Sequence, residues 1–221
     1  MNTPPIVAVA SDSGDFDAVC ELLSALPAAC PAAFIVVQHL DAAREKLPAA
    51  TIAKRTNLPV VRAQDGMLPE AGHVYVSVAH DILSVSGGRI RVTAGKTGGP
   101  HNPGDLLFAS LAVELGADSI GIVLSGAGSD GALGVRALRE RGGLTLAQYP
   151  GSARLPSMPI SAIETGCVEM VLRPFEIAAE LTRRLSHHAP SVPVVAPRAL
   201  VGELKAAPPA HVAAVRSSMN S

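Results

Sequence analysis

Tryptophan is absent from this 221-residue sequence, and cysteine, aromatic residues and long apolar runs are scarce. The cysteines, Cys20, Cys30 and Cys167, are odd in number and widely spaced, which argues against a disulfide framework or a metal knuckle. We expect each to be a small buried hydrophobe. No apolar run approaches the roughly 20 residues that span a bilayer, and the N-terminus lacks the features of a secretory signal. We therefore expect a cytoplasmic protein without membrane insertion.

The sequence also has almost no net charge, because it contains 18 Lys and Arg residues and 19 Asp and Glu residues. A net charge of -1 supplies no general field for attracting nucleic acid or anionic lipid, so no nucleic-acid partner is expected. Hydrophobic residues make up 48% of the chain, which excludes intrinsic disorder as its main state. The length fits one globular domain with a sizeable core.

Short β-branched runs alternate with helical stretches along most of the chain. This pattern is typical of a parallel sheet with helices on both faces, so we predict an α/β fold with a doubly wound, mostly parallel sheet. Asp15 is available as the N-cap of the first helix. The predicted strands are residues 6–10, 34–37, 60–63, 120–124, 144–147 and 167–172, and the predicted helices are residues 15–26, 43–55, 105–115, 132–141, 159–165 and 175–185.

The pattern changes twice outside these units. Alternating residues around Gly87-Gly88 predict a β-hairpin over residues 74–93. From Ser186 onward Pro, Ala and Val dominate, so we expect a domain over residues 5–185 and a mostly disordered Pro/Ala-rich tail over residues 186–221. The tail is the segment in which we expect any partner to be recruited.

Two apparent ligand motifs fail on inspection. Gly95-Lys96-Thr97 resembles the end of a phosphate-binding loop, but it follows a hairpin and lacks the required upstream glycine. The acids Asp12, Asp15 and Asp17 have the wrong spacing for a calcium loop, and Leu23 stands where the bidentate glutamate belongs. We therefore expect no metal and no cofactor.

Reactive side chains follow three of the predicted strands, in residues 10–14, 38–39 and 126–131. The carboxyl ends of parallel strands open into one crevice, so these segments are expected to converge. A nucleophile, a histidine base and a carboxylate that orients the histidine are the parts of a hydrolase triad. The glycines of the third segment can present backbone N–H groups at close range.

A series of short motifs occurs in order between Pro5 and Leu172: Val36-Val37-Gln38-His39-Leu40, Asp65-Gly66-Met67, Gly72-His73-Val74-Tyr75-Val76, Asp105-Leu106-Leu107-Phe108, Gly121-Ile122-Val123-Leu124-Ser125-Gly126, Asp130-Gly131, Ala147-Gln148 and Met158-Pro159. In these motifs the chain resembles the CheB-type protein-glutamate methylesterases of bacterial chemotaxis, especially the version fused to a CheR-type methyltransferase. The resemblance implies hydrolysis of glutamate methyl esters on chemoreceptors. It assigns His39 as the base, Asp130 as the orienting acid, and Ser13 and Ala127 as oxyanion donors.

The nucleophile position departs from the family pattern. Where the family has its serine, this chain has Asp12, within Ala10-Ser11-Asp12-Ser13-Gly14. Ser11 cannot simply replace it, because a shift of one residue at a strand end aims the side chain at the opposite face. Tyr149 and Pro150 also stand where the family usually has an acidic residue and its neighbour. The substrate-side wall is therefore expected to differ too.

A carboxylate at position 12 changes the expected chemistry. It favours a protonated His39, which is then a poor general base, and its attack on an ester would produce a high-energy anhydride. Loss of a triad nucleophile costs on the order of 10⁴ to 10⁶ in rate. We expect a catalytically impaired protein that binds chemoreceptor or signalling-protein helices. The alternatives are an active carboxylic-ester hydrolase, or a hydrolase in which Asp12 attacks an sp3 carbon.

Regulation is expected to come from another protein or to be absent. The sequence shows no receiver segment before Pro5, so phosphorylation control of the family's two-domain type is not expected within this polypeptide. A methyltransferase or a regulator acting in trans is the expected alternative.

Overall fold

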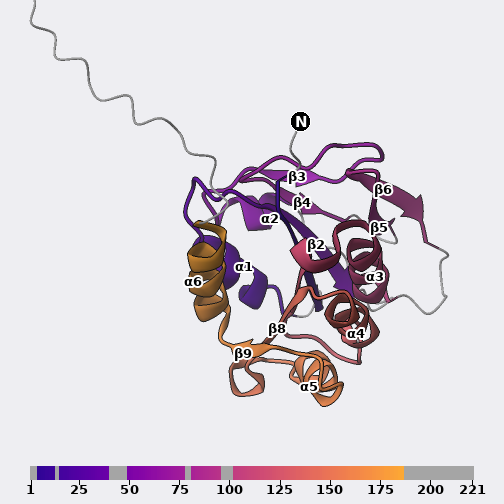
Figure 1. Cartoon of the computed structure of the whole chain (residues 1–221). Helices are drawn as coiled ribbons and strands as arrows, with labels where there is room; N and C mark the ends of the chain where they lie inside the picture. The colour runs from indigo at the N-terminus through magenta and orange to yellow at the C-terminus, as the bar shows by residue number, and fades with distance from the viewer. Residues whose placement is uncertain (1–3, 13–14, 40–48, 78–80, 96–101, 187–221) are drawn as a thin grey trace, which may run out of the picture. The chain divides into compact units, whose positions relative to one another are not determined.

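The computed structural model describes residues 4–12, 15–39, 49–77, 81–95 and 102–186 (Figure 1). A seven-stranded parallel sheet, ordered β3-β4-β2-β1-β7-β8-β9, forms its centre. Its strands are β1 (Ile6–Asp12), β2 (Ala33–His39), β3 (Val60–Arg62), β4 (Val74–Val76), β7 (Ile120–Val123), β8 (Leu144–Gln148) and β9 (Met170–Leu172). The helices are α1 (Asp17–Ser24), α2 (Ala49–Ala53), α3 (Pro103–Leu115), α4 (Ala132–Glu140), α5 (Ser157–Glu164) and α6 (Pro174–Leu185), with short 3-10 turns η1 (Gly116–Asp118) and η2 (Pro150–Ser152).

Each face of the sheet carries its own hydrophobic core. Side chains from α1, α2 and α6 cover one face, where they pack on Val7, Val9 and their neighbours. Side chains from α3, α4 and α5 cover the other face, where they pack on Ala8, Ala10 and their neighbours. The strand β1 is buried along its whole length because it lies in the middle of both cores. This arrangement confirms the predicted doubly wound α/β fold with helices on both faces.

The predicted hairpin over residues 74–93 is wrong in its first part. The segment Val74–Val76 is β4, which lies in the main sheet between β2 and β3 and pairs with both in parallel. It is buried on both faces, as expected for an inner strand. The hairpin consists instead of β5 (Asp81–Ser86) and β6 (Arg89–Ala94), whose turn residues Gly87 and Gly88 both have positive φ angles.

The start of α1 also differs from the prediction. Phe16 is the N-cap, and no side chain caps the helix. The Asp15 carboxylate instead accepts a hydrogen bond from the backbone N–H of Arg154, at 3.3 Å. Of the helix predicted over residues 43–55, the structure shows α2, while residues 43–48 lie outside the described residues.

The cysteines behave largely as predicted, since Cys20 and Cys30 are buried and free and Cys167 is half-buried and free. Burial raises the pKa of both the Cys20 and the Cys30 thiol. Within the described parts of the chain, no helix is both long enough and apolar enough to cross a membrane. Nearly all of the predicted tail, residues 187–221, lies outside those parts, so its boundary stays a prediction.

Candidate functional site

The last residue of β1 lies where three polypeptide segments meet. Asp12 is paired in register with His39, the last residue of β2. Its backbone N–H donates a hydrogen bond of 3.1 Å to the carbonyl oxygen of Ser125, which follows β7. Because β1 lies between β2 and β7, this is the crevice at which ligands bind in open α/β sheets. The backbone thus brings together the segments that the sequence analysis expected to converge.

The pleat of β1 separates Ser11 from Asp12. Ala8 and Ala10 belong to the core beneath α3, α4 and α5, so Asp12, two residues further, lies on that face. Ser11 lies on the opposite face, in register with Gln38. Its hydroxyl is buried and has no hydrogen-bond partner in the described part of the chain. Ser11 is therefore not a substitute for the side chain at position 12.

The Asp12 carboxylate accepts a hydrogen bond from a backbone N–H group of the crevice. Only 5% of the residue is exposed, and its Oδ2 accepts a hydrogen bond of 3.1 Å from the N–H of Ala127. Gly126 permits this approach, because a Cβ at that position would collide with the Met158 thioether and lie 2.9 Å from the Asp12 Cβ. The segment is held in place by a 2.8 Å bond from the Gly126 N–H to the Leu155 carbonyl oxygen.

The Asp130 carboxylate is tied to the start of α3. Its Oδ2 accepts from the Gly104 N–H at 2.9 Å and its Oδ1 accepts from the Asp105 N–H at 3.0 Å. These amides belong to the first turn of a helix, where backbone donors have no intrahelical partner and the helix dipole favours negative charge. Asp130 is 2% exposed. It therefore caps α3, whatever else it does in the crevice.

Asp105 caps the start of α4 in the same way. Its Oδ1 accepts a 2.8 Å hydrogen bond from the N–H of Gly134 in the first turn of that helix. Burial raises the pKa of the Asp105 carboxyl, and hydrogen bonds from the backbone of Gly134, Gly131 and Leu133 oppose that rise. On this face, α3 is thus capped by Asp130, which precedes α4, and α4 is capped by Asp105, which belongs to α3.

The predicted site residues are described to different degrees. Asp12, Ala127 and Asp130 are described with their side chains, and all three lie at the carboxyl ends of β1 and β7. For His39 the structure describes the backbone, and Ser13 lies outside the described residues. Contact between the His39 imidazole and the two carboxylates stays a prediction.

Some residues that shape the site were given no role in the sequence analysis. Gln148, the last residue of β8, is 1% exposed, and its Oε1 accepts from the Ser125 N–H at 2.8 Å. Its Nε2 donates to the Ser152 carbonyl oxygen at 3.1 Å, which joins the end of β7 to η2. The available signal was a polar residue ending a buried strand, inside the matched motif Ala147-Gln148. Among the described residues, no group of three or more His, Cys, Asp or Glu side chains could hold a metal ion.

Comparison with known proteins gives consistent matches. A family model for the CheB methylesterases matches residues 7–181. A protein-glutamate methylesterase/protein-glutamine glutaminase of Burkholderia orbicola is 36% identical over 185 residues, which are 83% of this chain and 55% of that protein. A protein of the same description from Anaeromyxobacter dehalogenans is 38% identical over 179 residues, which are 80% of this chain and 52% of that protein. This chain thus spans about half the length of these relatives.

A solved structure supports the same relationship. The CheB methylesterase catalytic domain of Thermotoga maritima superposes with a TM-score of 0.73 at 26% sequence identity. The match covers 83% of this chain and all of that one. The shared part therefore corresponds to the catalytic domain.

Proposed function

The chain belongs to the CheB methylesterase family, and we propose that it is a catalytically impaired member that binds chemoreceptor or signalling-protein helices without hydrolysing glutamate methyl esters. Membership supplies the chemistry that an intact site performs, which is hydrolysis of a carboxylic ester. The impairment is inferred from position 12, where the family serine would attack the ester carbonyl.

The observation that carries the proposal is the hydrogen bond from the Ala127 N–H to the Asp12 carboxylate. The family resemblance assigns this N–H to the oxyanion of the reaction. A donor aimed at developing negative charge is worth about 3 to 4 kcal/mol of transition-state stabilisation. The Asp12 carboxylate already accepts from that donor, so the ester oxygen would have to displace a carboxylate oxygen to reach it. The same side chain removes the nucleophile and blocks the oxyanion donor.

We also expect Asp12 to act on the base. Its backbone is paired with that of His39, and an anionic neighbour favours the imidazolium form of histidine, which accepts no proton. The residue thereby opposes three requirements of ester hydrolysis: a nucleophile, a neutral base and an available oxyanion donor. A crevice of this charge favours neutral or cationic side chains over glutamates, so we propose a binding role.

The test is a methanol-release assay on methylated chemoreceptor. The variants are Asp12→Ser, which supplies a hydroxyl, and Asp12→Asn, which removes the charge but supplies no nucleophile. We expect wild type and Asp12→Asn to release no methanol above background, which is a deficit on the order of 10⁴ or more relative to an intact family member. We expect Asp12→Ser to gain activity, because the backbone donor at Ala127 would then be released for the substrate.

The controls separate a chemical defect from a folding defect. All three proteins should show cooperative thermal unfolding, and adding His39→Ala to Asp12→Ser should abolish the gained activity. Wild-type turnover comparable to that of an intact family member would refute the proposal. Equal turnover of Asp12→Asn and Asp12→Ser would show that the charge, and not the missing hydroxyl, is the defect.

A further inference from the structure

Helix α3 has an apolar side that faces outward. Leu106, Ala109 and Val113 are exposed and lie at positions i, i+3 and i+7, so they form one stripe along the helix, which we call the α3 stripe. Leu106 is 47% exposed, and Val113, at 76%, is the most exposed large hydrophobic side chain among the described residues. A contiguous exposed apolar surface is typical of an interaction site.

The other sides of α3 are already engaged within the molecule. One side is buried against the sheet through Phe108 and its neighbours. On one flank the Ser110 Oγ accepts a 3.0 Å hydrogen bond from the Val85 N–H of the hairpin. On the other flank the Asp105 carboxylate accepts from the Gly134 N–H of α4. Figure 1 shows α3 between the hairpin and α4, so the α3 stripe is the side left for another molecule.

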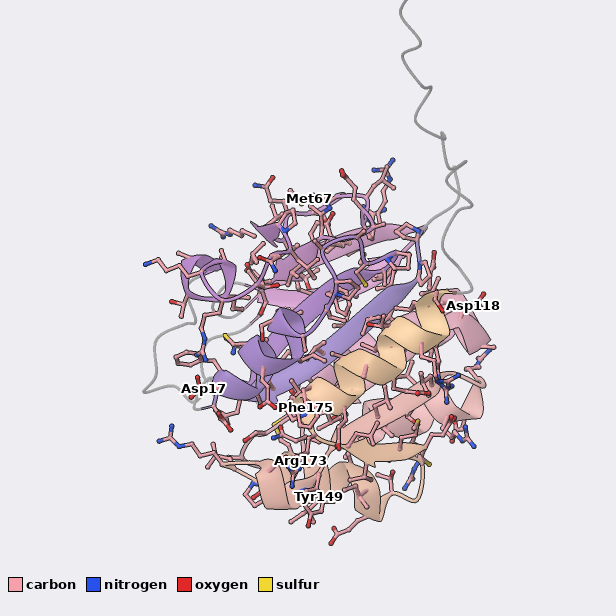
Figure 2. All side chains as sticks on the ribbon, turned by 90° about the vertical axis from the view of Figure 1, so that its left-hand side faces the viewer. Asp17, Met67, Asp118, Tyr149, Arg173 and Phe175 are labelled. Atoms are coloured by element: carbon pink, nitrogen blue, oxygen red, sulfur yellow. The ribbon has the colours of Figure 1, made fainter. Side chains whose placement is uncertain are left out.

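The helix α6, on the other face of the sheet, has the pattern of an ordinary surface helix. It crosses the front of Figure 2. Its charged side chains pair with one another, Glu180 with Arg183 at 2.7 Å and with Arg184 at 2.6 Å. The charged residues of α3, Asp105 and Glu114, instead accept hydrogen bonds from backbone N–H groups of α4 and the hairpin. The outward side of α3 is therefore apolar where that of α6 carries ion pairs.

A second copy of the chain carries the surface that matches the α3 stripe. The midpoint between Leu106 and Val113 falls between Ala109 and Ser110, so the stripe has large side chains at its two ends and small ones in its middle. When two copies of α3 pack antiparallel about a two-fold axis at this midpoint, each Leu106 lies against the Val113 of the other copy. The small side chains then meet at the crossing point, where they allow the two helices to approach closely. The stripe is thus complementary to itself.

We propose that the chain forms a two-fold dimer in which the α3 stripes of two copies pack antiparallel. The face of one short helix buries a small area, which corresponds to micromolar affinity rather than to an obligate dimer. The first turn of α3 holds the crevice residue Asp130, so antiparallel packing places the two crevices at opposite ends of the helix pair. The dimer does not depend on the chemistry of position 12, so it stands or fails independently of the proposed function.

The charges of α3 favour a second copy over a membrane or a charged partner. Helices that lie on membranes carry Lys and Arg beside their apolar side, and α3 contains neither residue. A charged segment of another protein finds no opposite charge on the α3 stripe, whereas the stripe of a second copy brings none. The net charge of -1 adds almost no long-range repulsion between two copies.

Sedimentation velocity of the full chain tests for the dimer. Between roughly 1 and 500 µM we expect a concentration-dependent shift from monomer to dimer. Leu106→Lys and Val113→Glu each place a charge in an apolar contact that occurs twice in the dimer, so each change alone should weaken dimerisation about tenfold or more. The matched control is Leu68→Lys, because Leu68 is also 47% exposed but lies outside α3, so this change should leave dimerisation unaltered. Thermal unfolding curves verify that every variant is folded.

A mixture of the two charged variants tests the antiparallel arrangement. In this arrangement the introduced lysine of one copy faces the introduced glutamate of the other, so equal amounts of Leu106→Lys and Val113→Glu should associate roughly tenfold more tightly than either variant alone. A mixture no better than the single variants, a chain that stays monomeric over the whole concentration range, or a dimer that both variants leave intact would each overturn the proposal. Monomers that sediment with neutral lipid vesicles would overturn it in favour of a membrane.

Discussion

The two buried carboxylates of the crevice, Asp12 and Asp130, are held in different ways. Asp130 binds two amides of the first turn of α3 and thereby supports the helix layer above the sheet. Asp12 binds the Ala127 amide across the crevice, and this contact supports no helix terminus. One carboxylate is part of the scaffold, and the other is the one to which we assign the change in what the crevice binds.

Under the proposed function, this difference explains how the site can keep most of its family pattern while its chemistry differs. The segment from Gly126 to Asp130 holds Met158 and the starts of α3 and α4 in place, so folding alone constrains it. The Asp12 hydrogen bond to the Ala127 N–H, by contrast, ends at no helix terminus. We therefore expect a substitution at position 12 to disturb the helix layer less than a substitution at position 130.

The strongest test of this comparison is Asp130→Ala. Removing the carboxylate leaves the Gly104 and Asp105 amides at the start of α3 without their acceptor, and each such buried donor costs about 1 to 3 kcal/mol. We expect a loss of about 3 kcal/mol in the free energy of unfolding, measured by urea denaturation. Asp12→Ala should cost less, about 1 kcal/mol, since the Ala127 amide that loses its acceptor lies outside the first turns of the helices. Equal losses would contradict the division into a scaffold carboxylate and a site carboxylate.

A second test addresses the close contact between α3 and β1. A Cβ at Gly104 would lie 2.7 Å from the Ala10 Cβ and 3.1 Å from both Asp130 oxygens. We expect Gly104→Ala to lower the free energy of unfolding by about 1 to 3 kcal/mol through overpacking. Adding Ala10→Gly removes the closest contact and should restore part of this loss. Strictly additive effects of the two changes would show that the crowding lies elsewhere.

A third test uses pH to probe Asp105, the carboxylate that caps α4. Burial raises the pKa of the Asp105 carboxyl above 3.8 in the folded state. Its contribution to stability is therefore present at low pH and is lost as pH rises through the folded-state pKa. Asp105→Asn lacks this loss, so its stability relative to wild type should increase from about pH 3 to about pH 7. Urea titrations at several pH values measure it, and parallel curves for the two proteins would contradict the prediction.

The smallest effect is expected at a carboxylate far from the crevice. Arg183, and then Arg184, lower the pKa of Glu180 on α6 to about 2. Its stabilisation is therefore present above pH 4.5 and is lost as pH falls toward 2. Glu180→Gln should remove a small, salt-sensitive part of the stability at neutral pH. Glu140→Gln on α4, where the described residues show no ion pair, should change nothing; an equal effect there would refute a specific role for the pair.

Much of the fold follows from local sequence. Continuous apolar runs such as residues 6–10 and 120–124 predicted β1 and β7, because a strand buried on both faces admits few polar residues. The assignment of residues 74–76 failed because Val-Tyr-Val has the same pattern in a hairpin as in a short parallel strand. Which strands a segment pairs with depends on the whole sheet, so this pairing cannot be predicted from three residues.

The site was predictable by residue type but not by contact. Sequence motifs placed Asp12 and Ala127 at strand ends, yet the hydrogen bond that joins them spans 115 residues. The capping of α3 by Asp130 likewise joins residues that lie 25 and 26 positions apart. A capping pattern within one helix can be read locally, whereas a cap supplied by another segment depends on tertiary structure.

The position of β1 between β2 and β7 has a consequence for how the chain folds. Val7 pairs with Phe34, which lies nearby in the sequence, and with Ile120, which does not. Pairings between distant residues form slowly, because a long loop must close before any contact compensates for its entropy. We therefore expect the half of the sheet from β1 to β4 to assemble first and the crevice to form only when β7 docks. During synthesis, a nascent chain that ends before β7 leaves one edge of β1 without its neighbouring strand until the segment from Ile120 onward emerges.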